Sequence, residues 1–492
     1  MLRHRAAATL ITAIALLSLA GCARLMEQPE ISPNRWAPRS VEHEWIPAPA
    51  VTKDFTLAEA APYEAAPVSP AVQARTAPPY DLTGLIDIAL RNNPRTRRAW
   101  EAARSAAANF GAARAPYYPL ADAEAINGYM RTPFELPGAI GTIQLWQAQP
   151  VIEMAYTLFD FGRRRSAAEA AQDRLIAADF SFNRAVQDVV FSTQTAFYTL
   201  DEAAAAVTAA QQNLKLARTD FDSVDQRLNH GLATEPELLL AKQRVAQSQF
   251  DLANARLLVH DAQANLAVAL GVPANREIRV DSLRDQTVPE SLGDAVDKLI
   301  AQARRERPDL AADVANLRAS NAQIASARAQ FFPAVALSAN YGESLWNYTF
   351  KGPPAVRTGQ PQYSALLTLK WDIFTGFKRL NDVRRAEADR EAASAELKSL
   401  ELNAIAEVWR SYYEFRSSRS KYDYAQSLLA ASQESYAANS ETYRQGLSTI
   451  VELLTAERDL ANARYILIQS KAELLTAYAA VAYAAGAVRT PG

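Results

Sequence analysis

Two short motifs place a threonine three residues before a glutamate, and each follows closely on a glycine. They occupy residues 234–237, after Gly231, and residues 449–452, after Gly446. This spacing is that of a capping box, in which the Thr hydroxyl and the Glu carboxylate each accept a hydrogen bond from the other residue's backbone N–H. Glycine suits the left-handed conformation that ends a helix. Each motif therefore predicts a sharp turn from one helix into the next.

The remaining polar residues show no pattern typical of catalysis or metal binding. His4 lies in the leader, and His43, His230 and His260 lack the spacing of metal ligands. We find no phosphate-binding loop, nucleophile elbow or paired-carboxylate cleft. Lys plus Arg (52) nearly balances Asp plus Glu (54), without a long basic run, so nucleic acid is not an expected partner. The sequence predicts neither an enzyme nor a metal or other cofactor.

The sole cysteine, Cys22, ends an N-terminal leader. Residues 1–21 combine Arg3 and Arg5 with an apolar stretch over residues 6–19, which is typical of a signal peptide. The segment Leu19-Ala20-Gly21-Cys22 resembles a bacterial lipobox, in which the cysteine receives a diacylglycerol thioether and, after cleavage, an N-acyl chain. The alternative is an ordinary secretory signal with an incidental cysteine.

The chain after Cys22 is expected to tether the protein to a membrane. Acyl chains contribute about 0.8 kcal/mol per buried methylene, so several would hold the N-terminus in a bilayer. The residue after the cysteine is Ala23 rather than Asp. Its resemblance to bacterial lipoprotein sorting signals implies that the protein is located in the outer membrane. Residues 22–80, which hold ten prolines after position 22, read as an extended tether.

The rest of the chain is duplicated. An offset of 214 to 215 residues brings Pro94 onto Pro308, and Phe159 onto Phe374. It also brings Pro119 onto Pro333, Gly231 onto Gly446 and Gly271 onto Gly486. A period this long indicates two large structural units rather than a solenoid. We expect a first repeat over residues 81–275, a linker over 276–294, a second repeat over 295–487 and a tail over 488–492.

Each repeat is expected to begin with a helix that a proline interrupts, over residues 81–115 and 295–330. Later, residues 163–230 and 377–445 contain neither glycine nor proline and are rich in strong helix formers. A helix of about 68 residues would be about 100 Å long.

A second long helix is expected to return in each repeat, over residues 237–270 and 450–485. Large residues recur every seven positions, and a small residue follows each after three; the pairs are Leu238/Ala241, Val245/Ser248, Leu252/Ala255, Val259/Ala262 and Leu266/Ala269, then Leu453/Ala456, Leu460/Ala463, Leu467/Ser470, Leu474/Ala477 and Val481/Ala484. A strict heptad predicts a left-handed coiled coil with closely spaced backbones.

Alternating apolar and polar residues predict one β-hairpin per repeat. The clearest runs are residues 335–342 and 362–373, and residues 146–158 repeat the pattern more loosely, with Pro150 expected to interrupt the strand. The loop containing residues 351–354 is rich in Gly and Pro, and residues 163–165, all arginine, are expected to mark a membrane boundary.

The four strands of one chain cannot close a sheet in hydrocarbon. We expect a homotrimer, whose twelve strands would form a β-barrel continuous with a hollow α-helical coiled-coil barrel. A dimer's eight strands would leave little lumen. The fold class is therefore mainly α with membrane β.

Each repeat has the order helix, β-hairpin, very long helix and returning coiled-coil helix, and this order occurs twice after a lipobox. It resembles that of the TolC-like outer-membrane efflux channels, and most closely that of their lipoprotein branch. The strand exits at residues 158–163 and 373–378 and the helical tips at residues 231–234 and 446–449 carry this resemblance. It implies a trimeric passive conduit from periplasm to exterior. A periplasmic membrane-fusion adaptor and an inner-membrane transporter, of resistance-nodulation-division or ABC type, would load it.

The resemblance also implies roles for the tips. Adaptor docking falls on Gly231, Leu232, Thr234, Gly446, Leu447 and Thr449, and the periplasmic gate on Tyr443, Glu452 and Glu237. Of the family's gate residues, the matching stretch keeps a tyrosine and one acid, whereas Ser448 and Thr455 stand where a basic residue and a second acid are expected. A salt-bridge latch is thus in doubt, and Glu452 could gate, cap its helix, or do both.

Two rival functions stay open: a coiled-coil structural or adhesive lipoprotein without a pore, and a periplasmic enzyme. The cargo is not encoded in any motif, because selection is largely the task of the pump.

Overall fold

The structure is a computed structural model that describes residues 80–136, 139–275, 278–280, 291–293, 295–349 and 356–488. The predicted signal peptide, Cys22, nearly all of the tether, the loop at residues 351–354 and most of the linker lie outside the described residues. No described helix is both long enough and apolar enough to cross a membrane.

Each repeat begins with two short helices that meet at a proline. In the first repeat these are α4 (Leu82–Asn92) and α5 (Pro94–Ala113), and in the second α8 (Val296–Glu306) and α9 (Pro308–Ala329). Both prolines occupy the first turn of the following helix, where a backbone N–H would have no helical partner. The predicted interruption is confirmed.

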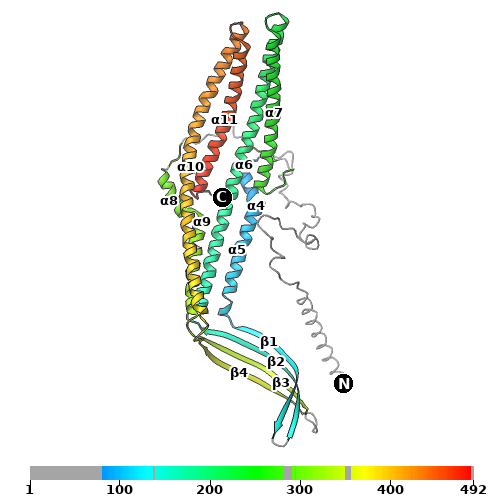
Figure 1. Cartoon of the computed structure of the whole chain (residues 1–492), viewed down its shortest axis with the longest axis vertical. Coiled ribbons are helices and arrows are strands. Elements are labelled where there is room, and N and C mark those ends of the chain that lie inside the picture. Colours follow the sequence, from blue (N-terminus) through cyan, green and yellow to red (C-terminus); the bar gives the residue numbers. More distant parts are fainter. Residues whose placement is uncertain are drawn as a thin grey trace. The chain divides into compact units, whose positions relative to one another are not determined.

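Long helical hairpins make up most of the described chain (Figure 1). The first hairpin is α6 (Arg163–Asn229) with α7 (Glu235–Leu270), and the second is α10 (Lys378–Arg444) with α11 (Ile450–Ala484). Both α6 and α10 have 67 residues, which corresponds to about 100 Å. Helix α6 packs against α7 and also against α11, so it joins the hairpins.

The predicted heptad seam is confirmed by burial. All the small seam residues are buried; on α7 they are Ala241, Ser248, Ala255, Ala262 and Ala269, and on α11 they are Ala456, Ala463, Ser470, Ala477 and Ala484. Small side chains at these positions let neighbouring helix backbones approach closely.

The described strands form one antiparallel sheet in the order β1-β2-β3-β4. Their bounds are β1 (Leu120–Leu136), β2 (Ala139–Phe159), β3 (Ala334–Thr349) and β4 (Val356–Lys370). Each repeat contributes one hairpin, as predicted, and the pairing of β2 with β3 joins the two repeats.

The prediction that Pro150 interrupts its strand is wrong. Strand β2 runs through Pro150, which pairs with Ala125 of β1 but, among the described residues, with none of β3. Gly342 of β3 makes room at this point, because a Cβ there would lie 2.4 Å from the Pro150 carbonyl oxygen. The missing proline N–H is tolerated where the ladder is locally open.

The predicted end of the last strand is also wrong. Residues 362–373 alternate except at Leu366, but β4 ends at Lys370. The Trp371 indole N–H instead donates to the Phe331 carbonyl oxygen at 3.0 Å, at the end of the preceding helix. Lys370 pairs with Ala334, the first residue of β3, so β4 has no partner on that strand beyond this point.

Corresponding contacts recur at the start of each repeat. Asn93 donates from Nδ2 to the Ala269 carbonyl oxygen at 2.8 Å, and Arg307 donates from Nη1 to the Ala484 carbonyl oxygen at 3.3 Å. The glycines that follow, Gly271 and Gly486, have φ of 71° and 75° and lie against these residues. The internal duplication thus extends to how each hairpin end is held.

Candidate functional site

The two helical tips turn in the same way. Gly231 and Gly446 have positive φ, of 69° and 75°. The Leu232 N–H donates to the Arg227 carbonyl oxygen at 2.7 Å, and the Leu447 N–H donates to the Thr442 carbonyl oxygen at 2.9 Å. These bonds close the helix ends as the glycine position predicts. Leu232 and Leu447 are left exposed, at 67% and 75%.

Both predicted capping boxes are present. The Thr234 N–H donates to the Glu237 carboxylate at 2.7 Å, and the Thr449 N–H donates to the Glu452 carboxylate at 2.8 Å. The Glu452 N–H in turn donates to the Thr449 hydroxyl at 3.3 Å. The two carboxylates therefore satisfy helix ends, while that of Glu452 stays exposed to solvent.

Tyr443 is buried between helices rather than exposed at the surface. Only 3% of it is accessible, and this α10 side chain packs with Val224 of α6, Ala241 of α7, and Ile450 and Leu453 of α11. Burial, together with the negative charge of Glu237, raises the pKa of the Tyr443 hydroxyl, although the Arg227 guanidinium opposes the shift. Tyr443 thus joins the two hairpins close to their tips.

Arg227, in the last turn of α6, contacts the second tip from the first. Its Nη1 donates to the carbonyl oxygens of Tyr443 and Arg444 at 3.0 Å each, and its Nη2 donates to that of Leu232 at 3.4 Å. The guanidinium carbon lies 4.8 Å from the centre of the Tyr443 ring. Sequence reasoning missed Arg227 because it searched for a basic residue in the second repeat only.

Ser448 occupies the position where the family resemblance led us to expect a basic side chain. In the structure its hydroxyl lies 3.1 Å from that of Thr442 on the same tip. Ser448 therefore makes a contact within one tip, whereas Arg227 links the two.

A buried polar cluster lies further from the tips, and sequence reasoning also missed it. We call it the tip cluster; its members are Asp220 of α6, Arg244 of α7, Tyr436 of α10 and Glu457 of α11. The Arg244 guanidinium Nε lies 3.0 Å from Glu457 Oε1, and the Tyr436 hydroxyl donates to Asp220 at 3.0 Å. No sequence motif marks these residues, because each comes from a different helix.

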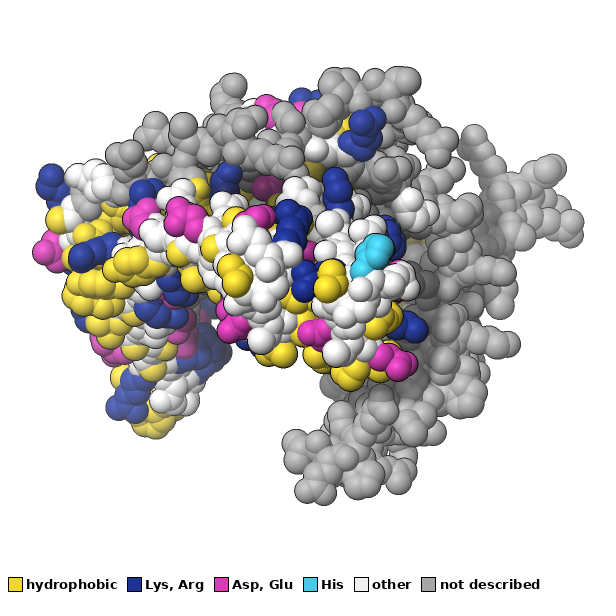
Figure 2. Space-filling model, turned by 90° about the horizontal axis from the view of Figure 1, so that it is seen from above, with side chains coloured by type: hydrophobic (Ala, Val, Ile, Leu, Met, Phe, Trp, Pro, Cys, Tyr) yellow, Lys and Arg dark blue, Asp and Glu magenta, His cyan; other side chains and the backbone are white. Residues whose placement is uncertain are grey.

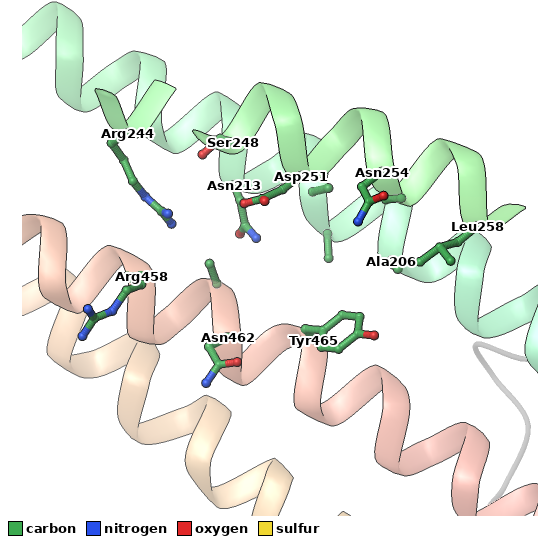
Figure 3. A pocket seen from close by; sticks show the side chains of 14 residues that line it. Ala206, Asn213, Arg244, Ser248, Asp251, Asn254, Leu258, Arg458, Asn462 and Tyr465 are labelled. Atoms are coloured by element: carbon green, nitrogen blue, oxygen red, sulfur yellow. The ribbon is translucent and has the colours of Figure 1, made fainter. Parts of the chain in front are cut away.

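A groove runs beside the tip cluster, between α7 and α11 (Figure 3). The cavity has a volume of 360 Å³. Alanines of α6 form much of its lining, and longer side chains project from the two facing helices; these include Arg244, Asp251, Asn254 and Leu258 of α7 and Arg458, Asn462 and Tyr465 of α11. A groove lined by small residues and flanked by amides and charges suits contact with another helix.

The exposed surface around the tips carries charges of both signs. Figure 2 views the molecule from above and shows acidic and basic side chains interspersed with apolar ones. Among the described residues, no group of three or more His, Cys, Asp and Glu side chains is placed to hold a metal ion.

Comparison with known proteins identifies the family. The profile of the family described as outer membrane efflux protein matches residues 85–272 and again residues 299–487. The chain belongs to this family. The double match coincides with the two repeats of this efflux protein, and the family is one of channels rather than enzymes.

Similar proteins span nearly the same length. The curated protein CyaE of Bordetella pertussis is 30% identical over 433 residues, which cover 85% of this chain and 88% of CyaE. The antibiotic efflux pump outer membrane protein ArpC of Pseudomonas putida is 26% identical over 94% of this chain and 93% of its own. The solved outer-membrane channel OprN has the same fold, with a TM-score of 0.73 at 22% identity over 83% of this chain and 91% of OprN.

Proposed function

We propose that three copies of this chain form a passive outer-membrane conduit of a tripartite efflux or secretion system. The observation that carries the proposal is the division of the sheet into an apolar and a polar face. Ile152, Tyr341 and Tyr363 are direct cross-strand neighbours on one face. Glu153, Asn340 and Ser364 form the adjacent row, which points to the other face.

The apolar face has no cover within the described chain. Tyr363 is 77% exposed and Leu367 is 70% exposed. A sheet with large apolar side chains on one face and polar side chains on the other fits a wall between lipid and a water-filled lumen.

Strands β1 and β4 are the two edges of the sheet, and only one side of each is paired among the described residues. Unpaired backbone groups in hydrocarbon cost several kcal/mol each, so these edges require other strands. Pairing β1 of one copy with β4 of the next would close the sheet, and three copies would supply twelve strands. The long helices of the three copies would continue the conduit into the periplasm.

Exposed aromatic side chains gather where the strands meet the helices. They are Tyr117, Tyr118, Phe159, Phe161, Phe331, Phe332, Trp371, Phe374 and Phe377. Aromatic rings favour the boundary between lipid and water. Three arginines at residues 163–165 follow shortly after the end of β2, at the start of α6. This boundary supports an outer-membrane location for the sheet. Lipidation of Cys22 would add an anchor in the same membrane.

The partners of this conduit would be a periplasmic membrane-fusion adaptor and an inner-membrane transporter of resistance-nodulation-division or ABC type. The name of ArpC, an antibiotic efflux pump outer membrane protein, supports a pump partner. Leu232 and Leu447, exposed at the tips, would offer apolar docking points, and the groove between α7 and α11 would extend this surface. The gate would comprise Tyr443, Glu452 and Glu237 together with Arg227.

Cysteine accessibility on β4 separates the conduit from a non-pore lipoprotein. Tyr363→Cys and Ser364→Cys place thiols on opposite faces at adjacent positions, in a chain whose only native cysteine is Cys22. In outer membranes, we expect a water-soluble thiol reagent to label Ser364→Cys and to spare Tyr363→Cys. Equal labelling of both variants would refute the membrane-embedded sheet and favour the structural or adhesive alternative.

A further inference from the structure

The tip cluster holds two carboxylates but only one paired guanidinium. Asp220 and Glu457 are 5% and 1% exposed. Arg244 contacts Glu457 Oε1, whereas Glu457 Oε2 is buried without a hydrogen-bond partner in the described structure. Both oxygens of Asp220 lie within 3.2 Å of the Tyr436 hydroxyl. The cluster is thus one donor short for two ionised acids.

This arrangement favours the protonated form of Glu457 while the helices are packed. An ionised carboxylate buried with one unsatisfied oxygen carries a desolvation cost, and a neutral one largely avoids it. Burial raises the pKa of Glu457 to about 7; Arg244 opposes the shift and the charge of Asp220 adds to it. Burial also raises the pKa of Asp220, against the effects of Tyr436 and Arg444.

The cluster spans the boundary between the hairpins. Glu457 and Tyr436 belong to the α10–α11 hairpin, and Arg244 and Asp220 to the α6–α7 hairpin. We propose that Glu457 is a proton-controlled clasp: when protonated it holds the two hairpins together near the tips, and when ionised it favours their separation. This inference rests on the proposed conduit and names a regulatory residue for its periplasmic end.

The direction of the pH effect follows from linkage. The packed state holds the proton with a pKa of about 7, whereas a separated, hydrated Glu457 would have its ordinary pKa of 4.5. Packing is therefore most stable below pH 4.5 and loses this contribution as the pH rises to about 7. The ratio of separated to packed hairpins should rise by at most about 300-fold, which corresponds to the difference between these two pKa values. An exposed salt-bridge latch would do the opposite, because acid would break it.

Distances between spin labels test the clasp in the full-length protein. Gln243→Cys on α7 and Thr455→Cys on α11 place labels at exposed positions near the cluster. Labelled subunits are mixed with an excess of unlabelled ones in lipid nanodiscs, so that distances within one chain dominate. Between pH 5 and pH 8.5 we expect the longer distance to gain population. Glu457→Gln should keep the short distance throughout, while the exposed control Asp459→Asn should titrate like the parent.

Separation on acidification, no change with pH, or an unaltered titration in Glu457→Gln would each overturn the clasp. If Glu457→Gln does not fold, Asp220→Asn provides a second test. It removes a negative charge that raises the pKa of Glu457, so the transition should move to lower pH. An unmoved transition would also overturn the proposal. The distances do not depend on ion conduction, so an absence of current would count against the conduit alone.

Discussion

Arg227 ties the two tips together through backbone carbonyl groups. Arg227→Ala removes its donors to Tyr443, Arg444 and Leu232. Hydrogen bonds from a charged donor typically contribute about 1.5–3 kcal/mol, and less where solvent screens them. We therefore expect the open probability in planar bilayers to rise by on the order of tenfold. Arg218→Ala, at an exposed position of the same helix, should leave gating unchanged. Equal gating in the Arg227→Ala and parent channels would contradict the tie.

Glu452 caps its helix and also places an exposed carboxylate at the tip. Glu452→Gln keeps an acceptor for the Thr449 N–H but removes the charge. If three such carboxylates surround the closed aperture, they attract cations. We expect the variant to keep its helix content by circular dichroism and to lose block by divalent cations. Unchanged conductance and unchanged cation block would show that Glu452 caps its helix only.

Local motifs predicted residues whose partners are close in sequence, and missed those whose partners are distant. The capping boxes were predictable because Thr449 and Glu452 satisfy each other within one turn. Arg227 and Glu457 bind groups more than 200 residues away, through a pairing of hairpins that no short pattern encodes. The burial of Tyr443 follows from the same pairing.

At the scale of elements, Gly342 governs the strand pairing that joins the repeats. A Cβ at position 342 would lie 2.4 Å from the Pro150 carbonyl oxygen, which is backbone and cannot easily move. Gly342→Ala should destabilise the sheet by about 1–3 kcal/mol or more. The matched control is Gly128→Ala on β1, where a Cβ meets nothing within 4 Å. We expect the trimer of the first variant to dissociate at lower temperature in a gel-shift assay, and equal dissociation temperatures would contradict this account.

The heptad seam should tolerate only small side chains. Ala262→Leu inserts a large residue where α7 packs into the core, and overpacking typically costs about 1–3 kcal/mol. Ala253→Leu adds the same volume at an exposed position of α7 and serves as the control. Circular dichroism during heating should show a lower melting temperature for Ala262→Leu alone. Similar melting of both variants would argue against a tightly packed seam.

Elements with a sustained period were predicted more accurately than their ends. Ten heptad pairs placed α7 and α11, and the absence of Gly and Pro placed α6 and α10. The end of β4 was missed because it depends on where the partner strand begins: Lys370 pairs with Ala334, the first residue of β3. Pro150 was misjudged because its partner strand, with Gly342 opposite, could not be known beforehand.

At the scale of the molecule, the duplication indicates why one chain is incomplete. Both repeats contribute a hairpin to a sheet that keeps two free edges among the described strands. The repeats also differ where they meet: the first provides Arg227 and Arg244, and the second provides Tyr443 and Glu457. Sequence alone predicted the repeats and their shared fold, but not this division of polar partners, which depends on the packing of α6 against α11.

Single-channel recording of the purified full-length protein in planar lipid bilayers tests the central claim most directly. The polar face of the sheet carries Asp122 opposite Glu153, so three copies would line the lumen with six such carboxylates. We predict stepwise ionic currents that favour cations, with the preference reduced by Glu153→Gln. A folded, membrane-inserted trimer that passes no current would contradict the conduit. The non-pore lipoprotein would then be the better account.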